Sequence, residues 1–295
     1  MSKIALIINT ASGTNDEKLK ELKRLLLEKS FLDIELIELN IKTINETIVD
    51  LTRKGFESIV ACGGDGTVSL IAGVIITQGL NVKLGVLPFG TFNHFAHDIH
   101  MPEKIEDALD ILRKGNSAFV DVGKVNTTYF VNNSSLGLYP KIVKYREEYQ
   151  KKGWHKNLAL VGAIFSLVAS RTALYIEFAG QNTRTLRRKT SFVFIGNNKY
   201  KIEGFTIGER DNIDQGLLSV YVARNVNWIR ILILGFHALT GTLLKQEDFN
   251  TIGLQTCTIS MRKKTVLVSH DGEISQMNTP LTYQIHPKVL RVIIP

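Results

Sequence analysis

A short stretch at residues 63–67 combines residue types that bind phosphate. In order it reads Gly63, Gly64, Asp65, Gly66 and Thr67. Glycine has no Cβ, so the backbone of this turn can approach a ligand closely. A helix that begins at Thr67 would present unpaired N–H groups and the positive end of its dipole to the turn, and both favour an anion such as phosphate. Asp65 beside a phosphate needs a cation, so the stretch favours a nucleotide bound with Mg²⁺.

A tight strand-to-helix turn with no ligand accounts for the same glycines, and the motif alone leaves this alternative open. The stretch matches neither common phosphate-binding template, because no Lys follows as in GxxxxGK(S/T) and the spacing is not GxGxxG. Val68 and Ser69 continue the predicted helix and belong to the same candidate nucleotide site.

A second candidate for chemistry is Asp271, which begins the sequence Asp-Gly-Glu after an apolar stretch. A carboxylate in such a turn can accept the proton of an attacking hydroxyl. Glu273 stands two residues further on and could orient a cation. Asp-Gly is also typical of a β-hairpin turn, and the local sequence by itself favours that interpretation.

The first 120 residues alternate between strand and helix patterns. Strands are predicted at Lys3–Ile8, 33–39, 59–62 and 83–87, and helices at 15–29, 43–54, 67–77 and 102–115. This alternation predicts an α/β domain with parallel strands and right-handed crossovers. Ligands of such sheets bind beyond the carboxyl ends of the strands, so the turns at 9–13, 63–66 and 88–93 should meet at one rim.

From about residue 121 the pattern changes to short alternating or β-branched segments separated by Gly, Asn and Asp. These segments lie at 119–124, 129–133, 174–178, 190–196, 217–222, 256–261, 265–268, 281–285 and 289–294. They predict a mostly antiparallel second domain, interrupted by helical insertions at 141–170 and 226–244. We therefore expect a nucleotide-binding domain at residues 1–122, a C-terminal strand at about 286–295 that returns to it, and a β-rich domain at 123–285.

The composition is that of an ordinary globular protein, with 44% hydrophobic and 22% charged residues in 295. Cys62 and Cys257 are far apart and give neither a disulfide framework nor a metal-binding spacing, which suits a reducing cytoplasm. The first residues lack the regions of a signal peptide, and no apolar run reaches the ~18 residues of a membrane-spanning helix. We therefore expect a cytoplasmic protein.

The net charge of +8 is concentrated in one part of the chain. Residues 141–189 contain eleven Lys or Arg and three Glu, a net charge of +8, while the rest of the chain is balanced. Such a patch favours an anionic partner, such as a membrane surface, a nucleic acid or an acidic ligand, although a solvated basic face is the alternative. We expect no nucleic-acid partner, because no aromatic residues are interleaved with the basic run at 184–189.

Four blocks of the sequence, in the same order, resemble the diacylglycerol kinase catalytic-domain family. They are Asn9 with Ser12 and Gly13, residues 63–67, PFGTFNHFA at 88–96, and Asp-Gly-Glu at 271–273. The resemblance spans nearly the whole chain. NAD kinases and phosphofructokinases share the phosphate loop, but the second domain has no block similar to the Asn-Asp-Glu of NAD kinases.

The resemblance implies an α/β N-terminal domain with a parallel sheet, like that of NAD kinases and phosphofructokinases. The second domain would be a mostly antiparallel, sandwich-like β domain with helical insertions, and it would bind a lipid. The implied activity is transfer of the γ-phosphoryl group of ATP, with Mg²⁺, to a lipid hydroxyl deprotonated by Asp271, with Glu273 also in the catalytic site.

The candidate nucleotide-binding residues follow from the same blocks. They are Asn9, Asn40, Gly63, Gly64, Asp65, Gly66, Thr67, Val68, Ser69, Gly90, Thr91 and Asn93. We expect the amides of Asn9 and Asn93 to tie neighbouring loops together, and Thr91 to offer its hydroxyl to phosphate or to cap a helix. Asn40, at the end of the second strand, is the candidate for the adenine contact. Asp65 is the candidate metal ligand.

The sequence departs from the family pattern at three places. Thr10 stands where the family usually has Pro, and His94 stands where an Asp commonly follows the Asn. Gln215 replaces an Asp that in bacterial lipid kinases helps to hold a structural Mg²⁺. A neutral amide is a weaker ligand, so a second metal site at Asn212, Gln215 and Leu217 is the least supported of the predicted sites.

A membrane surface is the expected partner of the basic insertion. Its basic and aromatic residues are Tyr145, Lys151, Lys152, Trp154 and Lys156, beside an apolar stretch at 157–170. Such mixed stretches lie at membrane interfaces, although a core helix at 158–169 is the alternative. We expect peripheral association with an anionic bilayer and leave a homodimer open. The competing functions are a small-molecule or NAD-type kinase and a non-catalytic protein that binds nucleotide and membrane.

Overall fold

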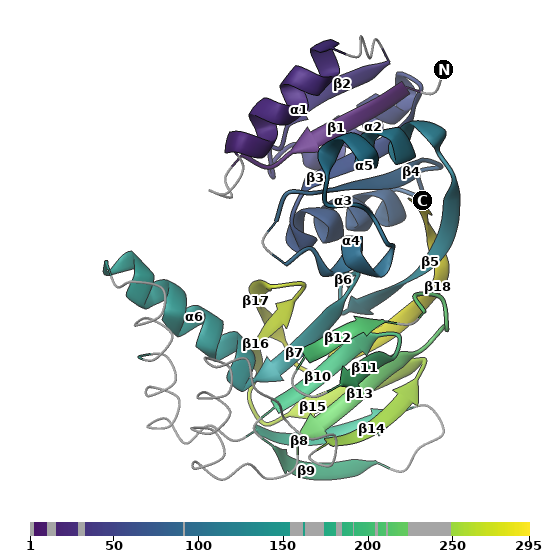
Figure 1. Cartoon of the computed structure of the whole chain (residues 1–295). Helices are drawn as coiled ribbons and strands as arrows, with labels where there is room; N and C mark the ends of the chain where they lie inside the picture. Colours follow the sequence, from purple (N-terminus) through teal and green to yellow (C-terminus); the bar gives the residue numbers. More distant parts are fainter. Residues whose placement is uncertain are drawn as a thin grey trace.

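The computed structural model has two lobes stacked end to end (Figure 1). It describes residues 3–10, 16–28, 33–90, 92–153, 162, 174–180, 185–190, 192–203, 206–210, 212–223 and 249–295. The first lobe contains the N-terminal helices and strands, and the second is built mainly of strands, with one helix projecting from it.

Strands and helices alternate through the first lobe, as predicted. They are β1 (Lys3–Ile8), α1 (Asp16–Glu28), β2 (Ile34–Glu38), α2 (Ile44–Arg53), β3 (Phe56–Gly63), α3 (Asp65–Thr77), β4 (Lys83–Pro88), α4 (His94–Asp98) and α5 (Ile105–Lys114). The four strands pair in parallel in the order β2-β1-β3-β4. Their carboxyl ends therefore lie at one edge of the sheet.

Two helix starts differ from the prediction. The helix after the glycine turn begins at Asp65 rather than Thr67, because Gly64 already occupies the N-cap position. The helix expected from Pro102 begins at Ile105, with Lys104 as its N-cap. Its predicted end is confirmed, since Gly115 adopts a left-handed conformation with φ of 68°, which glycine accommodates without strain.

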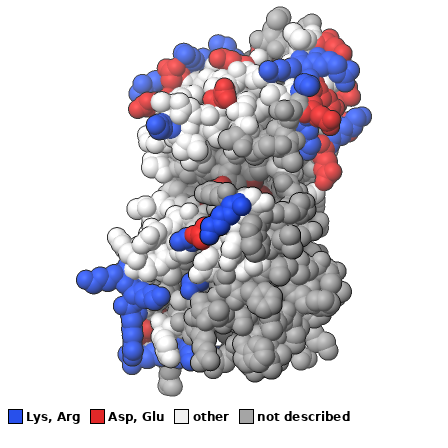
Figure 2. All heavy atoms as spheres, turned by 90° about the vertical axis from the view of Figure 1, so that its left-hand side faces the viewer, with Lys and Arg blue, Asp and Glu red and all other residues white. Residues whose placement is uncertain are grey.

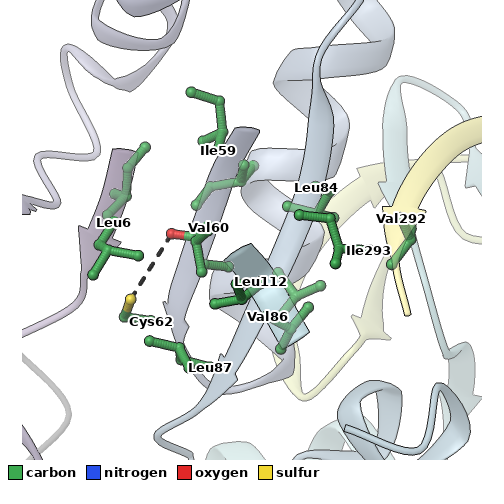
Figure 3. Close-up of a cluster of buried hydrophobic side chains, with 14 of the residues drawn as sticks. Leu6, Ile59, Val60, Cys62, Leu84, Val86, Leu87, Leu112, Val292 and Ile293 are labelled. Carbon is green, nitrogen blue, oxygen red and sulfur yellow. Dashed lines mark hydrogen bonds between the residues drawn. The ribbon is translucent and has the colours of Figure 1, made fainter. Parts of the chain in front are cut away.

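The core of the first lobe includes residues from the far end of the chain. Leu6, Val60 and Val86 from three parallel strands pack into one buried cluster with Val292 and Ile293 (Figure 3). These last two residues lie on β18 (Leu281–Ile293), which pairs with β4 in parallel at Val292 and Leu84. The same strand pairs antiparallel with β5 (Ser117–Val125) and with β15 (Thr256–Met261) in the second lobe. It thus belongs to both lobes.

The second lobe is a sandwich of antiparallel strands. A six-stranded sheet runs in the order β14 (Phe249–Leu254), β13 (Leu218–Ala223), β10 (Phe192–Asn197), β7 (Asn133–Gly137), β16 (Thr265–His270) and β17 (Glu273–Asn278). The facing layer is the far end of the ten-stranded sheet, formed by β18, β15, β8 (Leu174–Gly180) and β9 (Leu186–Thr190), with β5 and β6 (Thr128–Phe130) at its side. Buried residues from both layers, such as Ile195 and Ile259, share one cluster, so the predicted sandwich-like fold is confirmed.

Several details of the second lobe were not predicted. The single strand expected at 190–196 is two strands, β9 and β10, which lie in different sheets. A hairpin of β11 (Tyr200–Glu203) and β12 (Thr206–Arg210) follows them. Of the two predicted helical insertions, the first begins as α6 (Leu138–Lys151), while most of 152–170 and all of 226–244 lie outside the described residues.

No helix in the described part of the chain combines the length and the hydropathy needed to cross a membrane. The division into domains at residues 122 and 123 stays a prediction.

Candidate active site

The glycine turn connects β3 directly to α3. Gly64 is the N-cap, and its carbonyl accepts the N–H groups of Thr67 at 2.9 Å and Val68 at 3.2 Å. The Thr67 side chain folds back against Gly63, where a Cβ would overlap it. The turn is therefore as tight as the glycines suggested, and the start of α3 faces the space beyond the sheet edge.

The turn after β4 packs against the glycine turn backbone to backbone. A Cβ on Gly90 would overlap the Cα of Gly64 and would lie 2.7 Å from Asn93 Oδ1. The N–H of Phe89 donates to the carbonyl of Gly63 at 3.2 Å. Two of the loops predicted to share one rim are thus in direct contact, and position 90 has no room for a side chain.

Asp65 holds these two loops together. Its carboxylate accepts the N–H groups of His94 at 3.1 Å and Phe95 at 2.9 Å, which open α4. It also accepts the side-chain amide of Asn132 from the second lobe at 2.9 Å. Its carboxylate therefore binds the start of a helix and the other lobe, and its role as a metal ligand stays a proposal.

The two asparagines expected to tie loops behave differently. Asn9 donates to the hydroxyl of Thr67 at 3.1 Å and so links the first loop to the glycine turn. Asn93 instead closes its own loop, with two hydrogen bonds of 2.8 Å to the backbone of Gly90. The tie predicted for Asn93 is therefore made by Asp65. Thr91, Ser12 and Gly13 lie outside the described residues.

Three further nucleotide candidates have other local roles. Asn40 is exposed and accepts the N–H of Lys42 at 3.0 Å, which makes a turn of its own. Val68 is buried in the core of the first lobe. Ser69 donates to the carbonyl of Tyr129 at 3.1 Å, although it also lines the cavity described below. Asn40 does not line this cavity, although Leu39, Ile41 and Asn45 close to it do.

Asp271 occupies a β-hairpin turn, as its local sequence favours, but the turn is buried. Asp271 and Gly272 join β16 to β17 with φ of 46° and 87°, the positive values of a two-residue hairpin turn. Asp271 is only 7% exposed. Its carboxylate accepts three backbone N–H groups, from Val131 at 2.7 Å, Asn132 at 2.8 Å and Asn133 at 2.9 Å.

These surroundings act on the proton affinity of Asp271 in opposite directions. Burial disfavours the charged form and raises the pKa of Asp271 to about 6, and the nearby charge of Asp65 adds to the increase. The three N–H donors stabilise the anion and limit the rise. At neutral pH the group is ionised and held in one orientation, as a general base requires.

Both lobes line one cavity of about 860 Å³. The glycine turn and the loop at 90–94 form one side, and Asn132, Asp271 and Glu273 belong to the other. Figure 2 shows the hollow between the lobes, with acidic atoms visible inside it. Among the described residues that line it there are three carboxylates and no Lys or Arg. A highly charged anion bound here therefore needs a cation to accompany it.

Glu273 lies directly over the glycine turn. A Cβ on Gly66 would be 2.9 Å from Glu273 Oε1, so the start of β17 approaches the start of α3 closely. Glu273 has no hydrogen-bond or ion-pair partner among the described residues. The other two carboxylates in the cavity, Asp65 and Asp271, each accept three hydrogen bonds.

A carboxylate, that of Asp121, binds the backbone next to the predicted second metal site. Asp121 is fully buried and accepts the N–H groups of Gly216 at 2.6 Å and Lys288 at 2.8 Å. The carbonyl of Leu217 accepts the N–H of Asn198 at 2.9 Å, while Asn212 and Gln215 are exposed. The described residues contain no group of three or more His, Cys, Asp or Glu that could hold a metal. A metal at Asn212, Gln215 and Leu217 stays an untested prediction.

Two residues near the site escaped the sequence analysis. Asn132 is 1% exposed and contacts both Asp65 and Asp271. Arg210 is fully buried and donates to Asn132 and to Asp98. These four hydrogen bonds join residues that are 67 to 139 positions apart in the chain, so no local spacing indicates them.

The two halves of the chain match two family models. Residues 3–125 match the diacylglycerol kinase catalytic domain, and residues 155–294 match the YegS C-terminal NAD kinase beta sandwich-like domain. Diacylglycerol kinases of Staphylococcus aureus strains bovine RF122 / ET3-1 and MRSA252 are 33% identical over 135 residues. That stretch covers 45% of this chain and 42% of the relatives, so the chain matches less than half of their length.

Solved structures share the fold over the whole chain. One crystal structure from Bacillus anthracis str. Sterne superposes with a TM-score of 0.75 at 20% identity, covering 100% of this chain and 95% of that one. A diacylglycerol kinase from the same organism gives a TM-score of 0.69 at 18% identity, covering 100% and 97%. An NAD kinase from Archaeoglobus fulgidus in complex with ATP gives 0.51 at 11% identity, covering 98% and 93%. Residues 3–125 of the chain therefore belong to the diacylglycerol kinase catalytic-domain family, and the domain that follows is of the YegS C-terminal, NAD kinase beta sandwich-like type.

Proposed function

We propose that this protein is an ATP-dependent lipid kinase that phosphorylates the hydroxyl group of a diacylglycerol-like lipid. The observation that carries the proposal is the single cavity that contains both the glycine turn and the carboxylate of Asp271. Family membership supports a kinase, and the assignment of lipid, base and phosphate loop is our own.

The glycine turn would hold the phosphates of ATP. The N-terminus of α3 opens toward the cavity, and the contact of Gly64 with Gly90 forms a second stretch of backbone beside it. Backbone N–H groups at a helix start are a common phosphate-binding arrangement. The nucleoside end would extend toward Asn45, Leu39 and Ile41, which line the same cavity.

Asp271 would act as the general base. The lipid hydroxyl would lose its proton to Asp271 while its oxygen forms a bond to the γ-phosphorus. The bond from that phosphorus to the bridging oxygen would break, and ADP would leave. Three N–H donors leave the carboxylate with an unused lone pair, so the group is both oriented and able to accept one proton.

Mg²⁺ fits the donors present. The cavity offers carboxylate oxygens and no described Lys or Arg, and Mg²⁺ is usually bound by one or two carboxylates together with phosphates of the substrate. Glu273 is the carboxylate available to it, with Asp65 as the second candidate. When bound, the ion would neutralise charge on the phosphates.

The acceptor is proposed to reach the cavity from an anionic bilayer. The exposed basic residues of the second lobe include Lys144 on α6 and Arg187, Arg188 and Lys189 on the edge strand β9. Figure 2 shows Lys and Arg atoms gathered on one side of this lobe. Positive charge of this kind attracts the anionic surface of a bilayer. A peripheral position would bring the hollow between the lobes near the lipid.

The direct test is transfer of labelled phosphate from [γ-³²P]ATP into a total lipid extract, with the products separated by chromatography. We expect a labelled lipid whose formation requires Mg²⁺. Label in NAD but not in lipid, in the same assay with NAD added, would show a small-molecule kinase. Measurable ATP binding with no labelled product from any acceptor would favour a non-catalytic nucleotide-binding protein.

A further inference from the structure

Asn132 connects the two halves of the proposed site. Its backbone N–H donates to Asp271 at 2.8 Å, and its side-chain amide donates to Asp65 at 2.9 Å. Its side-chain oxygen accepts from Arg210 at 2.9 Å. All the polar groups of this side chain are thus used, in a residue that is almost completely buried.

Arg210 determines which way the Asn132 amide points. A guanidinium can only donate, so the oxygen of the amide must face Arg210 and its NH₂ group must face Asp65. If the amide turned over, its oxygen would face the Asp65 carboxylate and its NH₂ would face a cation. The orientation of the bond to the phosphate turn therefore depends on Arg210.

Arg210 is itself fixed on every side. Its Nε donates to Asp98 at 2.7 Å, its backbone N–H donates to the same carboxylate at 2.9 Å, and Nη1 donates to the carbonyls of Val131 at 2.7 Å and Asn197 at 3.0 Å. The side chain also lies over the ring of Tyr200, 5.6 Å from its centroid. A guanidinium with this many partners has one allowed position.

These contacts close a ring that crosses the two lobes. Asp65 binds the N–H groups that open α4, and Asp98 is the last residue of that helix. Asp98 binds Arg210 on β12, Arg210 binds Asn132, and Asn132 returns to Asp65. Two points of the first lobe and two of the second are thereby held at fixed separations.

We propose that Asn132 and Arg210 are positioning residues for phosphoryl transfer, which hold the phosphate turn and the Asp271 turn in the register that the reaction needs. The proposal rests on the proposed function. Asn132 acts through its hydrogen bonds to Asp65 and Asp271, and Arg210 acts through Asn132. Misplacement of reacting groups by about 1 Å can slow a reaction ~100-fold, so loss of this ring lowers kcat.

The test compares Asn132→Ala with Asn126→Ala. Each substitution deletes one donated and one accepted side-chain hydrogen bond of an Asn in the second lobe. Asn126 lies on the exposed turn between β5 and β6 and does not line the cavity, so it controls for loss of stability. The melting temperature of each full-length variant is measured first. Its kcat and its KM for ATP are then measured with lipid as acceptor, well below the melting temperature.

We expect kcat of Asn132→Ala to fall by roughly tenfold or more with a much smaller change in the KM for ATP, and Asn126→Ala to keep both. Arg210→Lys serves as the second variant, because a lysine keeps the charge beside Asp98 but cannot also reach Asn132 and the two carbonyls. It should lose kcat in the same way. Normal kcat in folded Asn132→Ala or in Arg210→Lys would overturn the proposal.

Failure of the proposed function would be recognised separately, as absence of transfer by the wild-type protein. In that case hydrogen–deuterium exchange tests whether the ring holds the Asp271 turn in place. Faster exchange of the amides of residues 131–133 in Asn132→Ala than in Asn126→Ala would support it, because those amides bind Asp271. Equal exchange in the two variants would refute it.

Discussion

Asp65 and Asp271 lie 206 positions apart in the chain and hydrogen-bond to the same residue, Asn132. Asp65 is the first residue of α3 in the glycine turn, and Asp271 lies in a buried hairpin turn of the other lobe. Neither carboxylate forms an ion pair with a Lys or Arg among the described residues. Both accept hydrogen bonds from N–H donors, which hold each carboxylate in a fixed position.

Asp271→Ala should lower phosphoryl transfer by about 100- to 10,000-fold, the usual contribution of a general base. Nucleotide affinity should persist, because Asp271 forms no direct hydrogen bond with the glycine turn. The measurement is kcat with lipid acceptor alongside ATP binding by calorimetry. Asp214→Ala, at an exposed carboxylate outside the cavity, is the matched control. Equal turnover in the two variants would remove Asp271 from the mechanism.

The pH dependence of kcat/KM should show an acid limb near pH 6. The pKa of Asp271 is raised by burial to about 6, above the ordinary value of 3.8, so the group takes up a proton as the pH falls through 6. A protonated carboxyl cannot accept the proton of the lipid hydroxyl, so activity is lost on the acid side and retained above it. An acid limb near pH 4 would contradict a buried base.

Gly90→Ala should weaken nucleotide binding by roughly tenfold or more, because a Cβ would overlap the backbone of Gly64 and force the two loops apart. Gly253→Ala provides the comparison. A Cβ there would lie 3.8 Å from the side chain of Leu217, which is ordinary contact. ATP titration of both variants measures the effect, and unchanged affinity in Gly90→Ala would mean that the loop contact is not part of the nucleotide site.

Replacement of Arg187, Arg188 and Lys189 by Gln should weaken binding to anionic vesicles. At about 1 kcal/mol per basic residue near the surface, the loss is about 3 kcal/mol, or roughly 100-fold. The control removes the same charge from exposed positions of α1, by Gln at Lys20, Lys23 and Arg24. Co-sedimentation with vesicles of phosphatidylglycerol and phosphatidylcholine at low and high salt tests this. Equal binding by the two triple variants would exclude β9 as the docking surface.

The sequence predicted the parts of the molecule that depend on local pattern. Alternation of strands and helices gave the parallel sheet of the first lobe, and short segments gave the antiparallel sandwich. Helix starts were less accurate because capping was misjudged: Gly64 caps α3 and Lys104 caps α5. No turn signal in the sequence separates β9 from β10, which lie in different sheets.

Residues that line the cavity were predicted where they form a compact motif and missed where they do not. Glycines and an Asp-Gly-Glu sequence indicated the two turns. The amide of Asn93 has a partner three residues away, and this local bond prevailed over the predicted tie between loops. Asn132 and Arg210 gain their roles from contacts made only after both lobes fold, so neither the spacing nor the residue type distinguishes them in the sequence.

The central claim is that the triphosphate lies between the glycine turn and Asp271. A crystal structure with Mg²⁺ and a non-hydrolysable ATP analogue tests it most directly. We predict phosphate oxygens at the N–H groups that begin α3 and the γ-phosphate in the cavity on the side of Asp271. A triphosphate bound away from the residue 63–67 turn, or one with its γ-phosphate directed away from Asp271, would contradict the account.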